Sequence, residues 1–172
     1  ATEKQVPETI MQTIAFIPLG LLATAGLNLF ALARRWLAGT PLPNYGFVGR
    51  WLLHMPRGRF RHDSIAASAP MRGERIVGWI AHYLVGIGFA ALLLSLTGID
   101  WLRQPTLLPA LLVGLGTVLA PFLLMQPGMG AGIAARLAPN PGAARRQSLL
   151  THALFGLCLY LAGCTLSLLP IV

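Results

Sequence analysis

The sequence predicts an all-α membrane protein: a four-transmembrane-helix bundle with a short interfacial amphipathic helix between helices one and two. Of its 172 residues, 55% are hydrophobic and only 10% are charged, and the mean hydropathy is +0.67. A soluble domain of this size would expose too much apolar surface. The hydrophobic residues also form long uncharged stretches, which indicates lipid around them. We therefore expect a single integral membrane domain over residues 1–172.

Four uncharged stretches are long enough to cross a bilayer, which takes about 20 apolar residues in a helix. They lack the alternation of barrel strands, and helices are the other structure that satisfies backbone hydrogen bonds in lipid. The stretches lie between Glu8 and Arg34, between Arg75 and Asp100, between Arg103 and Arg136, and between Arg146 and the C-terminus. The predicted helices are about 9–33, 75–98, 105–126 and 147–170.

The connection from Ala38 to Gly73 contains a shorter helix, predicted at about residues 44–55. This segment is too short to span, so we expect an amphipathic helix in the cytoplasmic interface with its arginines directed towards anionic lipid. Its apolar side carries Phe47, Val48, Trp51, Leu52 and Met55, and another side carries Arg50, His54 and Arg57.

The basic residues predict the orientation in the membrane. Eleven of the thirteen Lys and Arg residues fall in the segments 34–75 and 136–146, which places these segments in the cytoplasm. Both termini and the turn from Asp100 to Arg103 are then outside, which in a bacterial inner membrane is the periplasm. The net charge of +8 is thereby explained without a nucleic-acid partner.

Polar side chains inside a bilayer are costly, and four of them in the predicted spans form a candidate site: Asn28, His82, Gln126 and His152. Asn28, His82 and His152 each lie six or seven residues from the nearest predicted cytoplasmic arginine, which is roughly 9–10 Å along a helix. Gln126 ends an apolar run before a helix-breaking Pro127-Gly-Met-Gly130 sequence. We predict that the four side chains meet in the cytoplasmic half of the bundle.

Two interpretations of this cluster stay open. The polar groups either hold the helices together by hydrogen bonds, or they form a binding or proton-handling site whose imidazoles take a metal, a haem iron or a proton. As a metal site, the set His82, His152, Met125 and Met129 would suit a soft ion such as Cu(I), although its spacing matches no specific motif. The sequence identifies no cofactor.

A basic loop after the short helix is a second candidate. Its arginines could clamp phosphate and His62 beside Asp63 could serve acid–base chemistry, or the charges only set the topology. With the preceding basic residues, this set comprises Arg50, His54, Arg57, Arg59, Arg61, His62 and Asp63. No Walker loop, HExxH, GxSxG or CxxC pattern is present.

Several segments resemble an uncharacterised family of small four-helix bacterial inner-membrane proteins, a domain of unknown function. These are Val48-Gly-Arg-Trp-Leu-Leu-His-Met-Pro-Arg-Gly-Arg-Phe-Arg-His-Asp63, Thr106-Leu-Leu-Pro-Ala110, Ala120-Pro-Phe-Leu-Leu-Met-Gln-Pro127 and Ser148-Leu-Leu-Thr-His152. The resemblance covers most of the chain. It implies a multi-pass protein of the bacterial inner membrane and brings no activity, substrate or catalytic residue.

Three functions from different classes fit these observations. The first is a small-molecule or ion transporter or channel acting as an oligomer, because four helices make a thin wall for a pore in one monomer. The others are an accessory or assembly subunit of a larger membrane complex, and a membrane enzyme with a cytoplasm-facing polar site. The expected partners are membrane lipids, with either further copies of the chain or a larger complex.

Overall fold

The structure, a computed structural model, describes residues 14–169, and the helices it contains are joined by turns and loops with no strand among these residues. The predicted all-α class and the short helix between the first two spans are confirmed. The predicted start of the first helix at residue 9 and the end of the last at 170 lie outside the described residues. The elements are α2 (Phe16–Ala38), α3 (Tyr45–His54), η1 (Met55–Arg57), α4 (Glu74–Thr97), η2 (Ile99–Leu102), α5 (Leu107–Gly116), η3 (Pro121–Met125), α6 (Gln126–Gly128), η4 (Ile133–Ala135) and α7 (Pro141–Ser167).

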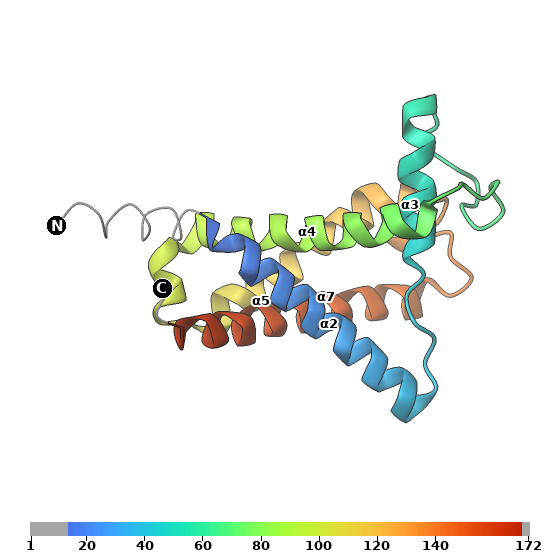
Figure 1. Cartoon of the computed structure of the whole chain (residues 1–172). Coiled ribbons are helices and arrows are strands. Elements are labelled where there is room, and N and C mark those ends of the chain that lie inside the picture. Colours follow the sequence, from blue (N-terminus) through green and yellow to red (C-terminus); the bar gives the residue numbers. More distant parts are fainter. Residues whose placement is uncertain (1–13, 170–172) are drawn as a thin grey trace. The chain divides into compact units, whose positions relative to one another are not determined.

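Four helices are long and apolar enough to cross a membrane: Phe16–Ala38, Glu74–Thr97, Leu107–Gly128 and Pro141–Ser167 (Figure 1). The third combines α5, η3 and α6. Large apolar side chains on these helices point outwards, and Leu29, Leu84 and Leu124 are 67%, 61% and 67% exposed. Such surfaces are stable in contact with lipid, so the chain has the features of a multi-pass membrane protein.

The last span begins earlier than the predicted residue 147. Its helix starts at Pro141, whose fixed φ and missing N–H suit the first helical position. The Asn140 side chain accepts a hydrogen bond from the Ala143 N–H at 3.0 Å and so caps this end. Arg145 and Arg146 therefore lie on the helix rather than in the loop before it.

The chain divides into two compact units. Unit 1 comprises residues 14–30, 83–116 and 153–169 of the described chain. Its core contains Leu19, Leu93, Leu102 and Leu159, all fully buried. A Cβ at Gly20 would overlap the Ile87 backbone, so α2 and α4 pack here with their backbones in contact, as small residues allow in membrane helices.

Unit 2 comprises residues 31–82 and 117–152. Within it, α3 lies across the start of α4 (Figure 1). A Cβ on Gly49 would overlap the Glu74 carbonyl, and one on Gly78 would overlap the Tyr45 carbonyl. Glycine on both helices is therefore what lets α3 seat on α4, and this seating positions the polar groups described next.

Candidate functional site

The third span is interrupted within unit 2. Pro121 has no N–H to donate, so the Thr117 carbonyl accepts a 3.1 Å hydrogen bond from the Ala120 N–H instead. A π-helical turn, η3, follows and is closed by a bond from the Gln126 N–H to the Pro121 carbonyl. Pro127 then lies in α6, which is only three residues long. Helical interruptions of this kind occur frequently at functional sites.

Two side-chain contacts join the interrupted segment to α7. The Thr117 hydroxyl and His152 Nδ1 are 2.8 Å apart, and Gln126 Nε2 donates to the Ser148 hydroxyl at 3.3 Å. Ser148 and His152 are four residues apart and so share one face of the helix. Gln126 Oε1 is buried and accepts no hydrogen bond within the described part of the chain. A buried acceptor without a hydrogen-bond partner is unusual in a folded protein.

Thr117 and Ser148 were not among the predicted site residues. Hydroxyl side chains are common in membrane helices because they can bond to their own backbone, so neither residue stood out. The sequence did hold one signal for Thr117, because it lies four residues before Pro121, where the helix must lose a backbone hydrogen bond. For Ser148, the only signal in the sequence was its spacing of four residues from His152.

The other predicted intramembrane residues have neighbours of their own. Asn28, in unit 1, donates through Nδ2 to the Tyr83 hydroxyl at 3.3 Å. His82, in unit 2, stacks on the Tyr45 ring with centroids 4.1 Å apart and an interplanar angle of 22°, and Trp79 meets it edge-on at 5.9 Å. Gln126 and His152 belong to unit 2 with His82. That all four residues form one site stays a prediction.

The predicted metal set also stays a prediction. In residues 14–169, no group of three or more His, Cys, Asp or Glu side chains is placed to hold a metal ion. A site built on His82 and His152 with Met125 and Met129 would therefore depend on thioether ligands, which favour soft ions.

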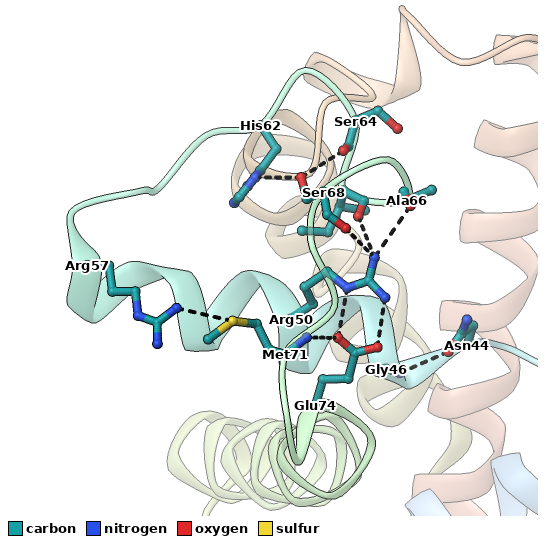
Figure 2. Close-up of polar contacts among 11 residues, drawn as sticks. Asn44, Gly46, Arg50, Arg57, His62, Ser64, Ala66, Ser68, Met71 and Glu74 are labelled. Carbon is teal, nitrogen blue, oxygen red and sulfur yellow. Dashed lines mark hydrogen bonds and ion pairs between the residues drawn. The ribbon is translucent and has the colours of Figure 1, made fainter.

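Arg50 has a structural role that its position in the sequence did not indicate. Its Nε and Nη2 donate to the two carboxylate oxygens of Glu74, each at 2.8 Å, and its Nη1 donates to the Ile65 and Ser68 carbonyls at 3.1 and 2.9 Å (Figure 2). The hydrogen bond to Glu74 raises the pKa of Arg50 above its usual value. The expectation that Arg50 faces anionic lipid is wrong, because the residue is only 7% exposed.

The side of α3 that packs on the protein also differs from the prediction. The buried positions are Gly46, Gly49, Arg50 and His54, whereas the predicted apolar side is only half-buried. Two glycines allow backbone contact and one arginine supplies a fixed ion pair. The helix thus seats on α4 through its small and basic residues, and its hydrophobic stripe is half-buried.

His54 and His62 form a buried stacked pair. They are 4% and 7% exposed, and their ring centroids are 4.9 Å apart with an interplanar angle of 29°. Burial lowers the pKa of His54, and the nearby His62 and Arg59 lower it further. His54 Nδ1 and His62 Nε2 are buried without a hydrogen-bond partner in the described residues.

The rest of the predicted basic loop is solvent-exposed, at Arg57, Arg59, Arg61 and Asp63. Two backbone bonds fix this loop to the end of the third span: the His62 N–H donates to the Gly128 carbonyl at 2.9 Å, and the Ile65 N–H donates to the Met129 carbonyl at 3.0 Å. A pocket of about 360 Å³ lies on the loop and is lined by Arg59, His62, Asp63, Ser64, Ala67, Ser68 and Ala69.

The predicted resemblance to an uncharacterised family is confirmed. The model of the family described as "Protein of unknown function (DUF2938)" matches residues 17–166. No curated protein matches the chain, and no solved structure matches it. Because the match covers most of the chain and all four helices able to cross a membrane, the protein belongs to the DUF2938 family.

Proposed function

We propose that the protein is a membrane transporter or channel for an ion or small molecule. The observation that carries the proposal is the interrupted third span, where Thr117 and Gln126 reach polar groups of α7. Backbone irregularity at membrane depth is tolerated where it is buried in protein or lines a water-filled cavity. Transporters use discontinuous helices in this way to bind their substrates and coupling ions.

The side chains at this interruption indicate the chemistry of the solute. They are a hydroxyl, an amide and an imidazole, and the Gln126 oxygen is buried without a partner among the described residues. The imidazole of His152 can donate or accept a hydrogen bond. The arrangement therefore suits a proton, a small cation or a small polar solute better than a large anion.

The proposal includes an oligomer. A bundle of four helices leaves little room for a conduit among its own side chains, and a path between two or more copies has no such limit. The protein also presents several large apolar side chains on its spanning helices, which can pack against another copy as well as against lipid.

The proposal also includes an orientation in the bacterial inner membrane. The segments 34–75 and 136–146 carry eleven of the thirteen Lys and Arg residues, which supports a cytoplasmic position for unit 2 and its basic loop. Both termini are then periplasmic. The interruption in the third span would lie towards the cytoplasmic end of the transport path.

Flux through the purified protein tests this function. The full chain is reconstituted in liposomes, and H⁺, Na⁺ and K⁺ fluxes are followed with entrapped indicator dyes against protein-free liposomes. Thr117→Val should lower the flux about three- to tenfold, which corresponds to the loss of one hydrogen bond. Thr165→Val is the matched control, because the Thr165 hydroxyl donates to the Leu161 carbonyl of its own helix.

Two results would contradict the proposal. One is the absence of flux for all three ions and for small polar solutes in vesicles that contain folded protein. The other is an equal effect of the two threonine substitutions. A different membrane protein that co-purifies in a fixed ratio with a flux-inactive chain would favour the accessory-subunit function instead.

A further inference from the structure

The buried stacked pair of His54 and His62 lies where three segments of unit 2 meet. His54 is the last residue of α3, and His62 belongs to the basic loop, which is bonded to the end of the third span through the Gly128 carbonyl. The two ring centroids are 4.9 Å apart. A change in either ring therefore acts on the contact between the helix and the loop.

The same three segments are joined by further contacts around the pair. Trp51 of α3 donates through Nε1 to the Phe60 carbonyl of the loop at 2.9 Å. A Cβ at Gly128 of the third span would overlap the Trp51 ring, and the Ile65 N–H of the loop donates to the Met129 carbonyl. The loop cannot leave the third span without breaking backbone hydrogen bonds.

The hydrogen bonds around His62 fix the position of its proton. Ser68 Oγ donates its single hydrogen to the Ser64 carbonyl at 2.9 Å, so it accepts from His62 Nδ1, which is 3.0 Å away (Figure 2). In the neutral ring the proton is therefore on Nδ1. Nε2 is buried and has no partner among the described residues, so a second proton there would be a buried donor without an acceptor.

His54 is likewise accommodated as a neutral ring. Its Nδ1 is buried and has no hydrogen-bond partner in residues 14–169. An imidazolium carries a proton on both nitrogens, so the charged ring would also bury a donor without an acceptor, which is unfavourable. Burial lowers the pKa of His54, and the nearby His62 and Arg59 lower it further.

The charged side chains around the pair do not compensate another cation. The cations near His54 are Arg50, Arg57 and Arg59. Residues 45–82 contain two carboxylates: Glu74 accepts two hydrogen bonds from Arg50, and Asp63 is exposed. The segment 126–132 of the third span has no charged residue. The remaining charged side chains of the loop and of the start of α4 are the exposed Arg61, Arg72 and Arg75.

We propose that His54 and His62 form an acid-sensitive latch, in which two neutral rings keep the basic loop on the third span and protonation of the pair releases the loop. Opening gives both rings access to water, which stabilises the charged form of an imidazole. Histidine suits this role because its charge changes between about pH 5 and 8. The latch does not rest on the transport proposal, and its test needs no flux measurement.

Hydrogen exchange of the full-length protein in detergent tests the latch. Exchange is measured at about pH 7.5 and about pH 5.5 and corrected for the intrinsic effect of pH on amide exchange. Because the closed arrangement lowers the pKa of His54 below 6.5, the latch should be closed above that pH and open as the pH falls below it. Peptides covering 58–68 and 126–131 should exchange about tenfold faster at the lower pH, relative to peptides from α5 in unit 1.

Variants without the two titrating groups identify the pair as the cause. The double variant His54→Phe, His62→Phe keeps two rings, and His54→Gln, His62→Gln keeps hydrogen-bonding groups in smaller side chains. Either one, shown by thermal unfolding to be folded, should exchange equally at the two pH values. His82→Gln is the matched control, because this histidine of unit 2 stacks on Tyr45 outside the pair, and the tenfold acid effect should remain.

A variant that keeps both histidines tests the role of the surrounding charge. Arg59→Gln removes an exposed cation near His54, so the charged ring is less unfavourable in the closed arrangement and the acid effect should shrink about twofold. Arg103→Gln makes the same charge change in unit 1 and should leave the acid effect unchanged.

Several results would overturn the latch. One is the absence of faster exchange in the loop at the lower pH. Another is an equal increase in the α5 peptides, which would indicate general unfolding. An acid effect that persists in a folded double variant, that is abolished by His82→Gln, or that Arg59→Gln and Arg103→Gln change equally would also overturn it.

Discussion

Replacing Arg50 with methionine should release α3 from the start of α4. The substitution leaves the Glu74 carboxylate, whose side chain is 18% exposed, without its cation, and it removes the donor to the Ile65 and Ser68 carbonyls. Breaking a buried ion pair by removing one partner costs about 3–5 kcal/mol. Glu74 keeps the hydrogen bond from the Met71 N–H at 2.8 Å, so we expect the lower end, about 3 kcal/mol.

Hydrogen exchange measures this release locally. A loss of about 3 kcal/mol corresponds to exchange on the order of 100-fold faster for the amides of Tyr45–His54, because each 1.4 kcal/mol is a factor of ten. The protein is compared in the same detergent at the same pH, and peptides from α5 in unit 1 serve as the internal reference. The double variant Arg50→Met, Glu74→Met should recover much of the protection, because no buried charge then remains unpaired.

The chain offers a matched control in its other described ion pair. Arg103 and Asp100 are 3.4 Å apart, but their side chains are 58% and 82% exposed. An exposed pair contributes about 0–1 kcal/mol, so Arg103→Gln should leave stability nearly unchanged. If Arg50→Met and Arg103→Gln had the same small effect, or if the double variant were no more protected than the single one, the reasoning about Arg50 would be refuted.

Three further predictions follow from the packing, the titration and the charge pattern. Gly49→Ala should destabilise the seating of α3 by about 1–3 kcal/mol, because its Cβ would overlap the Glu74 carbonyl, whereas Gly88→Ala, with open space at its Cβ, should be neutral or slightly stabilising in a thermal unfolding assay. Burial lowers the pKa of His54 from its usual 6.5, so the unfolded chain binds the proton more readily. The contribution of His54 to stability should be full above about pH 6.5 and should be lost as the pH falls below it. In unfolding scans at several pH values, His54→Phe should flatten this dependence, and an unchanged slope would contradict the prediction. Reporter fusions after Gly98 and Leu137 should report the periplasm and the cytoplasm respectively, and the opposite pattern would reject the proposed orientation.

The sequence was sufficient to predict the four spans, because the length of a segment and its lack of charge can be read from that segment alone. Its helix limits were less accurate where charge was used to place them. The charge pattern predicts Arg145 and Arg146 at the end of a loop, but the helix begins before them, at Pro141 with Asn140 as its cap. A charged residue marks where lipid ends, and the helix can continue beyond that point.

The contacts of the candidate site depend on pairings that no local pattern contains. The helical period predicted that α3 exists, yet Arg50 pairs with Glu74 across 24 positions, and the periodicity cannot show which face will be covered. Similarly, the sequence shows that His152 is a polar residue in a span, but the contact of His152 with Thr117 joins positions 35 apart. The helix interruption that brings Thr117 into place arises from Pro121, and its consequence appears only when the backbone bonds are traced.

The contacts within unit 2 imply that the basic loop and the interrupted span cannot move independently. The loop is bonded to the chain directly after η3 by the His62 to Gly128 and Ile65 to Met129 backbone bonds, and a Cβ at Gly128 would overlap the Trp51 ring of α3. A rearrangement of α6 must therefore either break both backbone bonds or carry the loop, and with it His62, along. Since His62 lines the pocket on the basic loop, a ligand that binds one arrangement of the loop more tightly biases α6 towards that arrangement by the same free energy. The pocket on the basic loop and the proposed transport path would then be linked through two hydrogen bonds and one aromatic contact.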